Sequence, residues 1–256
     1  LTQREHIPAF QDISPAQARI SDDRDWRVFA FYGFGERSAQ NCELCPATAR
    51  ALDGIPGVYN ALFSILAPGK HVPRHSGVTT GFIRCHLALI VPKQREGCRM
   101  DVDGSRVLWE EGKAVLFDDS RPHEVWNETD ETRAVLLFDV PRPMTLWGRG
   151  LLALLMAVLR HTYYVSEMHA NQRRWESRTV GVFGKPARAP AESTSTALRT
   201  RHDDRALHRG ESRSGEFTLV APQARARVKR AISMPVIQNG TGADSYFVRL
   251  ARGLEE

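Results

Sequence analysis

The sequence has few cysteines, no long apolar run and no evident internal repeat, and each shortage narrows the class of protein. Four cysteines in 256 residues, with no signal-peptide pattern, favour a reducing compartment and argue against a disulfide-stapled secreted domain. No run approaches the roughly 18 apolar residues that a membrane-spanning helix needs. Without a repeat period, nothing indicates a solenoid or a propeller. We therefore expect a cytoplasmic protein, with peripheral contact to a membrane as the alternative. Because the sequence begins with Leu1 and not Met, an anchor in upstream sequence stays open as well.

Cys42 and Cys45 form the one C-x-x-C pair. A structural zinc site needs a second cysteine pair, or histidines at matching spacing, and neither follows here. The pair is therefore interpreted as structural or incidental.

The net charge of +5 is unevenly distributed. Residues 1–184 contain 22 Lys/Arg and 22 Asp/Glu, whereas residues 185–256 contain 13 and 8. The basic excess thus belongs to the C-terminal segment, and the sequence predicts no nucleic-acid partner for the folded part.

Short apolar runs separated by Pro, Gly and Asp predict a mainly β fold. Trp26 to Tyr32 is typical of a strand, and Pro46 to Leu52 of a short helix. Six further strands are expected, with turn signals such as Asp103-Gly104 between them: Ala61–Ala67, Phe82–Val91, Cys98–Val102, Lys113–Phe117, Glu124–Trp126 and Ala134–Val140. This pattern favours a β-sandwich or jelly roll.

The chain divides into four expected parts. Residues 1–60 carry the N-terminal strand and helix of the main domain, and residues 61–144 form its β core. Residues 145–184 are a helical extension. Residues 185–256, rich in Ala, Arg, Ser, Thr and Pro, are expected to be a basic, disordered tail.

A helix is predicted from Leu146 to Val165, and its Leu-rich stretch is apolar nearly all round between Arg149 and Arg160. Such a helix is buried against its own domain or a partner chain. The alternative is peripheral contact with a membrane, in which flanking arginines lie among headgroups and leucines enter the interface.

Two histidines carry the chemistry. His75 and His123 lie 48 residues apart, each at a strand edge, and Arg133 follows ten residues after the second. Neutral imidazoles suit iron(II), and a buried arginine can anchor a carboxylate bidentately. The pattern indicates a non-haem iron oxygenase with a dicarboxylate co-substrate.

The segment from Phe10 to Met144 resembles the aspartyl/asparaginyl β-hydroxylase family, which uses iron(II), 2-oxoglutarate and O2. The resemblance lies in Ile55-Pro56-Gly57, Phe63 to Gly69, His75 to His86, Trp109 to Lys113 and Phe117 to Trp126. It implies a double-stranded β-helix, similar to a cupin. A carboxylate ligand two residues after His75 is replaced by Gly77, and this family is known for lacking that ligand.

The resemblance also implies roles for single residues. His75 and His123 would bind iron. Asp119, four residues before His123, is our own candidate for the carboxylate that holds a water ligand of the metal, and Asp118 is expected to point to the opposite face of an extended strand. Arg133 with Ser64 would take the distal carboxylate of 2-oxoglutarate. Arg84 and His86, two apart on one strand face, would take the carboxylate beside the keto group.

The substrate remains open at the level of sequence. Namesake relatives hydroxylate the β-carbon of Asp or Asn in peptides, which is the first expectation here. His71, Arg74 and Arg121 flank the expected metal mouth and could receive an acidic group. Bacterial branches hydroxylate acyl chains of lipid A or aminolipids, an alternative that the Leu-rich helix favours. The alternative from another class is a non-catalytic, cupin-like metal-binding module.

Overall fold

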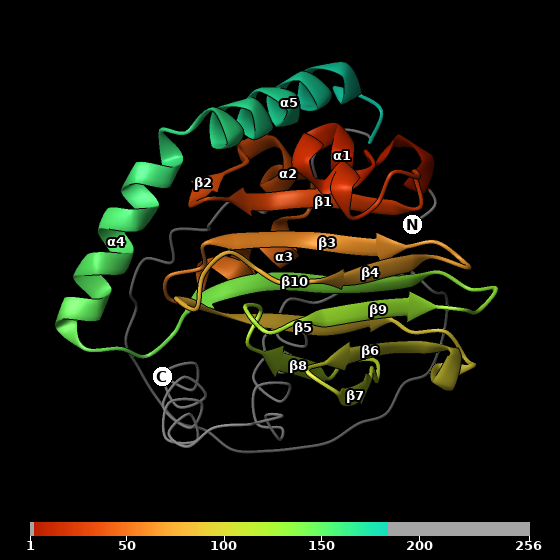
Figure 1. Cartoon of the computed structure of the whole chain (residues 1–256). Coiled ribbons are helices and arrows are strands. Elements are labelled where there is room, and N and C mark those ends of the chain that lie inside the picture. The colour runs from red at the N-terminus through yellow and green to blue at the C-terminus, as the bar shows by residue number, and fades with distance from the viewer. Residues whose placement is uncertain (1–2, 184–256) are drawn as a thin grey trace, which may run out of the picture.

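The computed structural model describes residues 3–183, in which two antiparallel β-sheets pack face to face as a jelly roll (Figure 1). The larger sheet has six strands in the order β2 (Glu36–Arg37), β1 (Trp26–Gly33), β3 (Asn60–Leu66), β10 (Arg133–Pro141), β5 (Phe82–Ile90) and β8 (Ala114–Phe117). The smaller sheet has the order β4 (His71–His75), β9 (His123–Asn127), β6 (Cys98–Val102) and β7 (Ser105–Leu108).

The predicted mainly β jelly roll is therefore confirmed, and all six core strands are present to within two residues at each end. The Asp103-Gly104 turn joins β6 to β7, and both of its residues have positive φ, 52° and 84°. Such a two-residue turn matches the twist of the strands that it connects. Strands β2, β4 and β7 were not predicted, because β2 has only two residues, β4 contains Pro73, and β7 has a single buried residue, Val107.

Alternation along the strands divides the core into two layers. In β10, Leu136 and Phe138 belong to the layer on the outer face of the large sheet, whereas Val135 and Leu137 belong to the layer between the sheets. The outer layer is covered by α2 (Ala39–Leu44) and α3 (Pro46–Asp53). Both faces of β10 are therefore buried, which explains its nearly continuous apolar sequence.

Shorter helical elements complete the N-terminal part: η1 (Arg4–His6), α1 (Phe10–Ile13) and η2 (Pro15–Arg19). A further short helix, η3 (Arg95–Gly97), lies between β5 and β6. All four cysteines are free thiols, and Cys42 of α2 is buried within the outer layer. The expected tail at 185–256 lies outside the described residues.

The prediction of a single helix from Leu146 to Val165 is wrong. Two helices are present, α4 (Leu146–Arg160) and α5 (Tyr163–Thr179), which meet at a sharp bend (Figure 1). Thr162 has extended backbone angles, φ −73° and ψ 151°, and its hydroxyl donates to the carbonyl of Leu159 at 2.6 Å. This hydrogen bond closes the end of α4 and redirects the chain.

Helix α5 lies over the N-terminal helices and β1, whereas α4 runs down the side of the sandwich at the strand ends (Figure 1). Within residues 3–183, no helix combines the length and the apolar character that a membrane span requires.

Candidate active site

His75 and His123 face each other from the paired strands β4 and β9. The two ring centroids lie 4.2 Å apart. Val72 pairs with Val125, so an undisturbed register would place residue 74 opposite His123; instead an extra residue in β4 places His75 there. A bulge of this kind re-aims side chains. It brings both histidines to the same place between the sheets.

Both histidines are held in the tautomer that suits a metal ligand. The Nδ1 atom of His75 lies 2.7 Å from the carbonyl oxygen of Pro73, and that of His123 lies 2.9 Å from the carbonyl oxygen of Arg121. A carbonyl oxygen can only accept, so each Nδ1 carries the proton and each Nε2 keeps its lone pair. Burial lowers the pKa of His75, and burial together with His75 lowers the pKa of His123 to about 4. At neutral pH both rings are uncharged.

Asp119 stands where a third ligand would otherwise project. A Cβ atom built on Gly77 would lie 1.9 Å from Oδ2 of Asp119, so the carboxylate fills the space that the missing side chain leaves. The Gly77 amide donates to the Asp119 carbonyl at 2.7 Å, and Oδ1 of Asp119 lies 3.5 Å from Nε2 of His123. Burial raises the pKa of Asp119 to about 6. Among residues 3–183, no group of three or more His, Cys, Asp or Glu is arranged to hold a metal ion, so the site offers two histidines with a carboxylate beside them.

Arg133 is a buried cation without a carboxylate partner in the described part of the chain. The residue is 2% exposed; its Nη1 donates to the carbonyl oxygen of Ser64 at 3.2 Å and to Oγ at 3.4 Å. Its Nε has no hydrogen-bond partner, and its guanidinium lies 4.7 Å from the centre of the Trp109 ring. Burial lowers the pKa of Arg133 to about 10. Because a buried charge is costly unless it is paired, this site fits an anionic ligand.

His86 lies in the same layer between the sheets and is 5% exposed. Neither ring nitrogen has a hydrogen-bond partner among the described residues. Its ring stacks on Trp109 at 6.1 Å and meets Phe117 edge-on at 5.1 Å. Burial, reinforced by the charges of Arg133 and Arg84, holds the pKa of His86 well below its usual value. A neutral His86 can therefore donate one hydrogen bond to a ligand that enters this layer.

Arg84 shares the strand face of His86, as expected, but it is already paired. Its guanidinium donates to both carboxylate oxygens of Asp139, at 2.8 and 2.9 Å, and also to Asp119. Asn60 donates to the same Asp139 carboxylate at 2.8 Å. Burial alone would lower the pKa of Arg84, but the two carboxylates raise it above its ordinary value. Arg84 would contact a co-substrate only after its hydrogen bond to the Asp119 carboxylate is broken.

Asp139 and Asp118 have clear structural surroundings. The sequence prediction did not include Asp139. This acid interrupts the apolar residues that follow Arg133 in β10, and that interruption was the signal available in the sequence. Asp118 accepts from the backbone and the hydroxyl of Ser120, at 3.1 and 2.6 Å, and pairs with Arg142 at 2.6 Å. Asp118 is therefore a turn residue that points away from the histidine pair.

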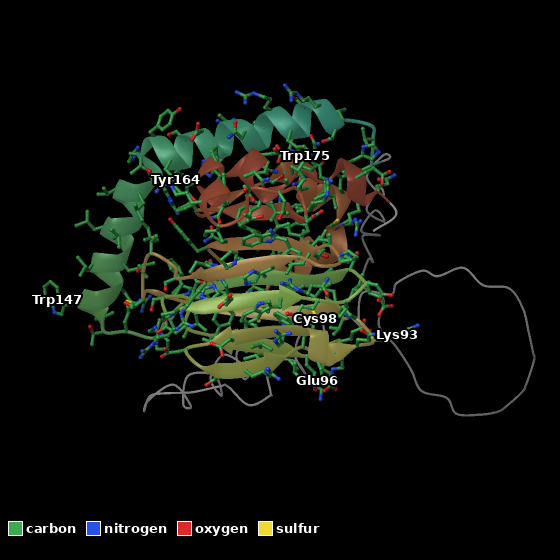
Figure 2. The ribbon with its side chains drawn as sticks, turned by 45° about the vertical axis from the view of Figure 1, so that its right-hand side comes forward. Lys93, Glu96, Cys98, Trp147, Tyr164 and Trp175 are labelled. Atoms are coloured by element: carbon green, nitrogen blue, oxygen red, sulfur yellow. The ribbon has the colours of Figure 1, made fainter. Side chains whose placement is uncertain are left out.

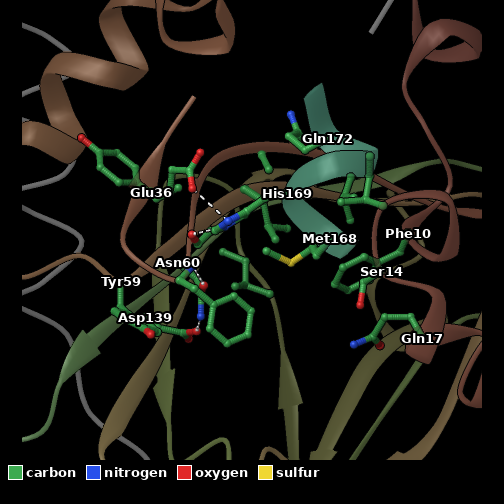
Figure 3. Close-up of a pocket in the computed structure, with 18 of the residues that line it drawn as sticks. Phe10, Ser14, Gln17, Glu36, Tyr59, Asn60, Asp139, Met168, His169 and Gln172 are labelled. Atoms are coloured by element: carbon green, nitrogen blue, oxygen red, sulfur yellow. Dashed lines mark hydrogen bonds and ion pairs between the residues drawn. The ribbon is translucent and has the colours of Figure 1, made fainter. Parts of the chain in front are cut away.

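A mainly apolar cavity of about 830 Å³ adjoins the site. His75, Gly77, Arg84 and Asp119 are among the residues that line it. Its walls come from the strands and from α4 and α5, and include Tyr59, Leu62, Leu137, Leu155, Met156, Leu159 and Met168. Figure 3 shows Met168 and His169 of α5 on one side of this space and Tyr59 and Asn60 on another.

Other parts of the cavity wall also carry polar side chains. His169 pairs with Glu36 at 2.8 Å and donates to the Gly33 carbonyl at 3.0 Å (Figure 3). The sequence prediction missed the contribution of α5 to this cavity, because its apolar positions are few and scattered among charged ones.

The three basic residues expected at the mouth lie elsewhere. His71 pairs with Glu124 at 2.7 Å, Arg121 with Asp103 at 3.3 Å, and Arg74 with Asp101 at 3.9 Å. None of the three lines the cavity. They are ordinary surface ion pairs on the smaller sheet.

Three comparisons place the chain among known proteins. Residues 1–143 match the family described as Aspartyl/Asparaginyl beta-hydroxylase. The chain is 42% identical over 178 residues to the ornithine lipid ester-linked acyl 2-hydroxylase of Rhizobium tropici, covering 70% of this chain and 63% of that one. It is 34% identical over 134 residues to the human aspartyl/asparaginyl beta-hydroxylase, covering 50% of this chain and 17% of the other. The chain thus spans less than two thirds of the length of either relative.

A solved structure, the cupin 2 conserved barrel domain protein from Salinispora arenicola, aligns with a TM-score of 0.32 at 15% identity, over 54% of this chain and 91% of that one. The family match covers more than half of the chain and includes the paired histidines, Asp119 and Arg133. The chain belongs to the aspartyl/asparaginyl beta-hydroxylase family.

Proposed function

We propose that this chain is an iron(II)- and 2-oxoglutarate-dependent hydroxylase that acts on the acyl chain of an amino-acid-containing lipid. One observation carries the proposal: His75 and Asp119, beside His123, form part of the wall of a large, mainly apolar cavity. Its volume, about 830 Å³, lies within the range of roughly 300–1,000 Å³ that is usual for ligand pockets. An apolar cavity beside a metal site suits a hydrocarbon chain better than a peptide segment.

The donor set fits iron(II). Two neutral imidazoles, each oriented by a hydrogen bond from Nδ1 to a carbonyl, present free Nε2 atoms toward one place. Asp119 lies beside them, and its pKa of about 6 suits a carboxylate that accepts a hydrogen bond from a water ligand.

The layer between the sheets fits 2-oxoglutarate. Arg133 offers a buried positive charge to the distal carboxylate, and Ser64 beside it offers a hydroxyl. His86 offers a hydrogen-bond donor between Arg133 and the histidine pair, because both of its nitrogens lack partners. Burial of all three excludes water, which strengthens each charge-assisted contact.

Each component then has a defined part in the reaction. When bound, iron(II) with 2-oxoglutarate and O2 supplies the oxidation that turns a C–H bond into C–OH, with succinate and carbon dioxide as the other products. Arg133 and Ser64 fix the orientation of the co-substrate, and Asp119 holds water beside His123. The cavity places one carbon of the substrate chain near His75 and excludes bulk solvent.

The name of the Rhizobium relative favours the lipid substrate over the Asp or Asn side chain that was expected first. The human relative, matched over half of this chain, is the ground for keeping peptide hydroxylation as the second candidate. The cavity favours the first, because its lining is mainly apolar and the basic residues expected to bind an acidic peptide lie outside it.

The test supplies the full-length chain with iron(II), 2-oxoglutarate and O2, and offers either ornithine lipid or an Asp/Asn-containing peptide. We expect one oxygen atom to be added to the lipid acyl chain, with one succinate formed for each lipid hydroxylated. His123→Ala should abolish both products. His71→Ala, a histidine of the same sheet that is 45% exposed at its side chain, should retain them.

The alternatives give different results. Oxygen added to the peptide and not to the lipid would establish the second candidate. Iron binding without succinate from either substrate would leave the metal-binding module as the remaining interpretation and reject the proposed hydroxylase.

A further inference from the structure

Helix α4 has two faces with opposite surroundings. Met156, with Leu152 and Leu159, packs on Tyr59 and Phe82 of the sandwich. The outer face is apolar as well, yet it is exposed: Leu146 80%, Trp147 91%, Leu151 69%, Leu154 62%, Leu155 41% and Val158 58%. Figure 2 shows Trp147 at one end of the helix, pointing away from the strands. An apolar patch of this kind marks an interaction surface.

The segment that carries this face is basic. Residues 140–166 include Arg142, Arg149 and Arg160 but neither Asp nor Glu, and of the three arginines Arg142 is paired with Asp118 from outside the segment. Arg149 is exposed in the first turn of the helix, two residues from Trp147 and two from Leu151. Arg160 donates to the Phe34 carbonyl at 2.9 Å and lies over the Tyr59 ring. Positive charge therefore borders the apolar stripe at both ends.

The exposed face is continuous with the cavity. Leu155 is 41% exposed and also lines the cavity, as does Val78, which is 91% exposed in the loop between β4 and β5. That loop directly follows His75. A path of apolar side chains thus runs from the outside of α4 to the histidine pair.

We propose that the outer face of α4 is a docking surface for an anionic phospholipid bilayer. Leucines and Trp147 would enter the boundary between headgroups and acyl chains, and Arg149 would contact lipid phosphates. Only the biological role of this docking rests on the proposed function: a substrate acyl chain would pass from the bilayer along α4 into the cavity without crossing water. The binding itself requires neither iron nor 2-oxoglutarate.

A second copy of this chain is a poorer occupant. A symmetric contact through α4 would bring the same basic residues of two copies together, and no acid within 140–166 would pair with them. The bilayer surface supplies the complementary negative charge. The positive charge of this segment therefore favours an anionic bilayer over a second copy of the chain.

The experiment measures binding of the full-length, metal-free chain to vesicles of phosphatidylethanolamine and phosphatidylglycerol, by sedimentation at low and moderate salt. The double variant Leu151→Ser with Leu154→Ser should lower the partition coefficient at least about tenfold. Val180→Ser, which changes an apolar residue that is 72% exposed beyond α5, is the matched control and should bind as the wild type does. Residues 184–256 are present in every variant, so their contribution is constant.

A second readout locates the contact. Vesicles that contain lipid brominated on the acyl chain should quench tryptophan fluorescence in the wild type, and Trp147→Phe should remove most of that quenching. Arg149→Glu should weaken binding to anionic vesicles and leave the weaker binding to phosphatidylcholine unchanged.

Three results would overturn the proposal: no vesicle binding by the wild type, equal binding by the wild type and the double leucine variant, or quenching that persists in Trp147→Phe. A dimer in lipid-free solution that the leucine substitutions dissociate would identify a second copy as the occupant instead. Failure of lipid hydroxylation, by contrast, would leave vesicle binding unaffected, so this proposal and the proposed function are tested separately.

Discussion

At the residue scale, Arg133 shows what the interior of the sandwich is built to receive. The residue is 2% exposed, its Nε lacks a partner, and the nearest groups are the Ser64 oxygens and the Trp109 ring. Asp139 lies in the same strand but is paired with Arg84. A buried guanidinium that makes only neutral contacts lowers the stability of the free protein, and a ligand carboxylate would recover that loss.

Replacing Arg133 should therefore change stability and ligand binding in opposite directions. Arg133→Met removes an uncompensated buried charge, so we expect the free energy of unfolding to stay the same or rise by up to about 1–4 kcal/mol. The same variant should lose the thermal stabilisation that 2-oxoglutarate gives the wild-type protein. Chemical denaturation and thermal melts with and without 2-oxoglutarate measure both effects. A variant that is strongly destabilised yet still stabilised by 2-oxoglutarate would show that Arg133 is a structural residue.

At the element scale, the edge strand β4 and the bend between α4 and α5 determine which side chains surround the histidine pair and the cavity. β4 is an edge strand, where Pro73 does no harm because its missing N–H faces no partner strand. The bulge beyond Val72 turns His75 inward to meet His123. The bend at Thr162 lets α4 close one side of the cavity while α5 returns over the N-terminal helices. A single straight helix would leave the cavity without one of these walls.

The inner face of α4 should provide the contacts that hold this helix on the sandwich. Met156 is 6% exposed, so Met156→Ala is expected to lower the local unfolding free energy of α4 by about 2 kcal/mol or more. Leu154→Ala, at a position that is 62% exposed, should change it little. Hydrogen exchange of the α4 amides in lipid-free protein distinguishes the two. Equal protection in both variants would mean that α4 is held by something other than the cluster with Tyr59 and Phe82.

At the scale of the whole molecule, the cavity exists because α4 and α5 pack against the sandwich. Its walls combine β-strand residues near the histidines with α4 and α5 residues distant in the sequence. The lining is mainly apolar, with polar side chains near His75, such as Arg84, Asp119 and Asp139, and others such as Glu36 and His169. A molecule with a long apolar chain and polar groups matches this composition.

Affinity for linear alkyl carboxylates should therefore rise with chain length until the cavity is filled. Burial of one methylene is worth about 0.8 kcal/mol, which corresponds to roughly fourfold in affinity for each carbon added. Calorimetry on a homologous series, below the concentration at which the compounds aggregate, gives the slope. Leu159→Trp, which narrows the wall beside α4, should shorten the chain at which affinity stops rising. Affinity independent of chain length would show that the cavity does not take an acyl chain.

Much of the fold follows from local patterns in the sequence. Apolar runs bounded by Pro, Gly and Asp mark the strands, and the Asp103-Gly104 turn specifies its own hairpin because both residues accept positive φ. The side-by-side placement of Arg84 and His86 follows from the two-residue period of a strand. The family match also agrees with the motifs around His75 and His123.

The arrangement of the site depends on contacts between distant segments. The pairing of Arg84 with Asp139 and Asp119, the bulge that turns His75 inward, and the carboxylate of Asp119 in the space left by Gly77 each join residues that only strand pairing brings together. The exposure of the outer face of α4 also depends on tertiary contacts. The sequence of a helix that is apolar all round does not indicate which side will pack against the protein. Local sequence therefore determined the strands and the residue types of the site, and tertiary packing decided which charges were paired, which were left for a ligand, and where the cavity opens.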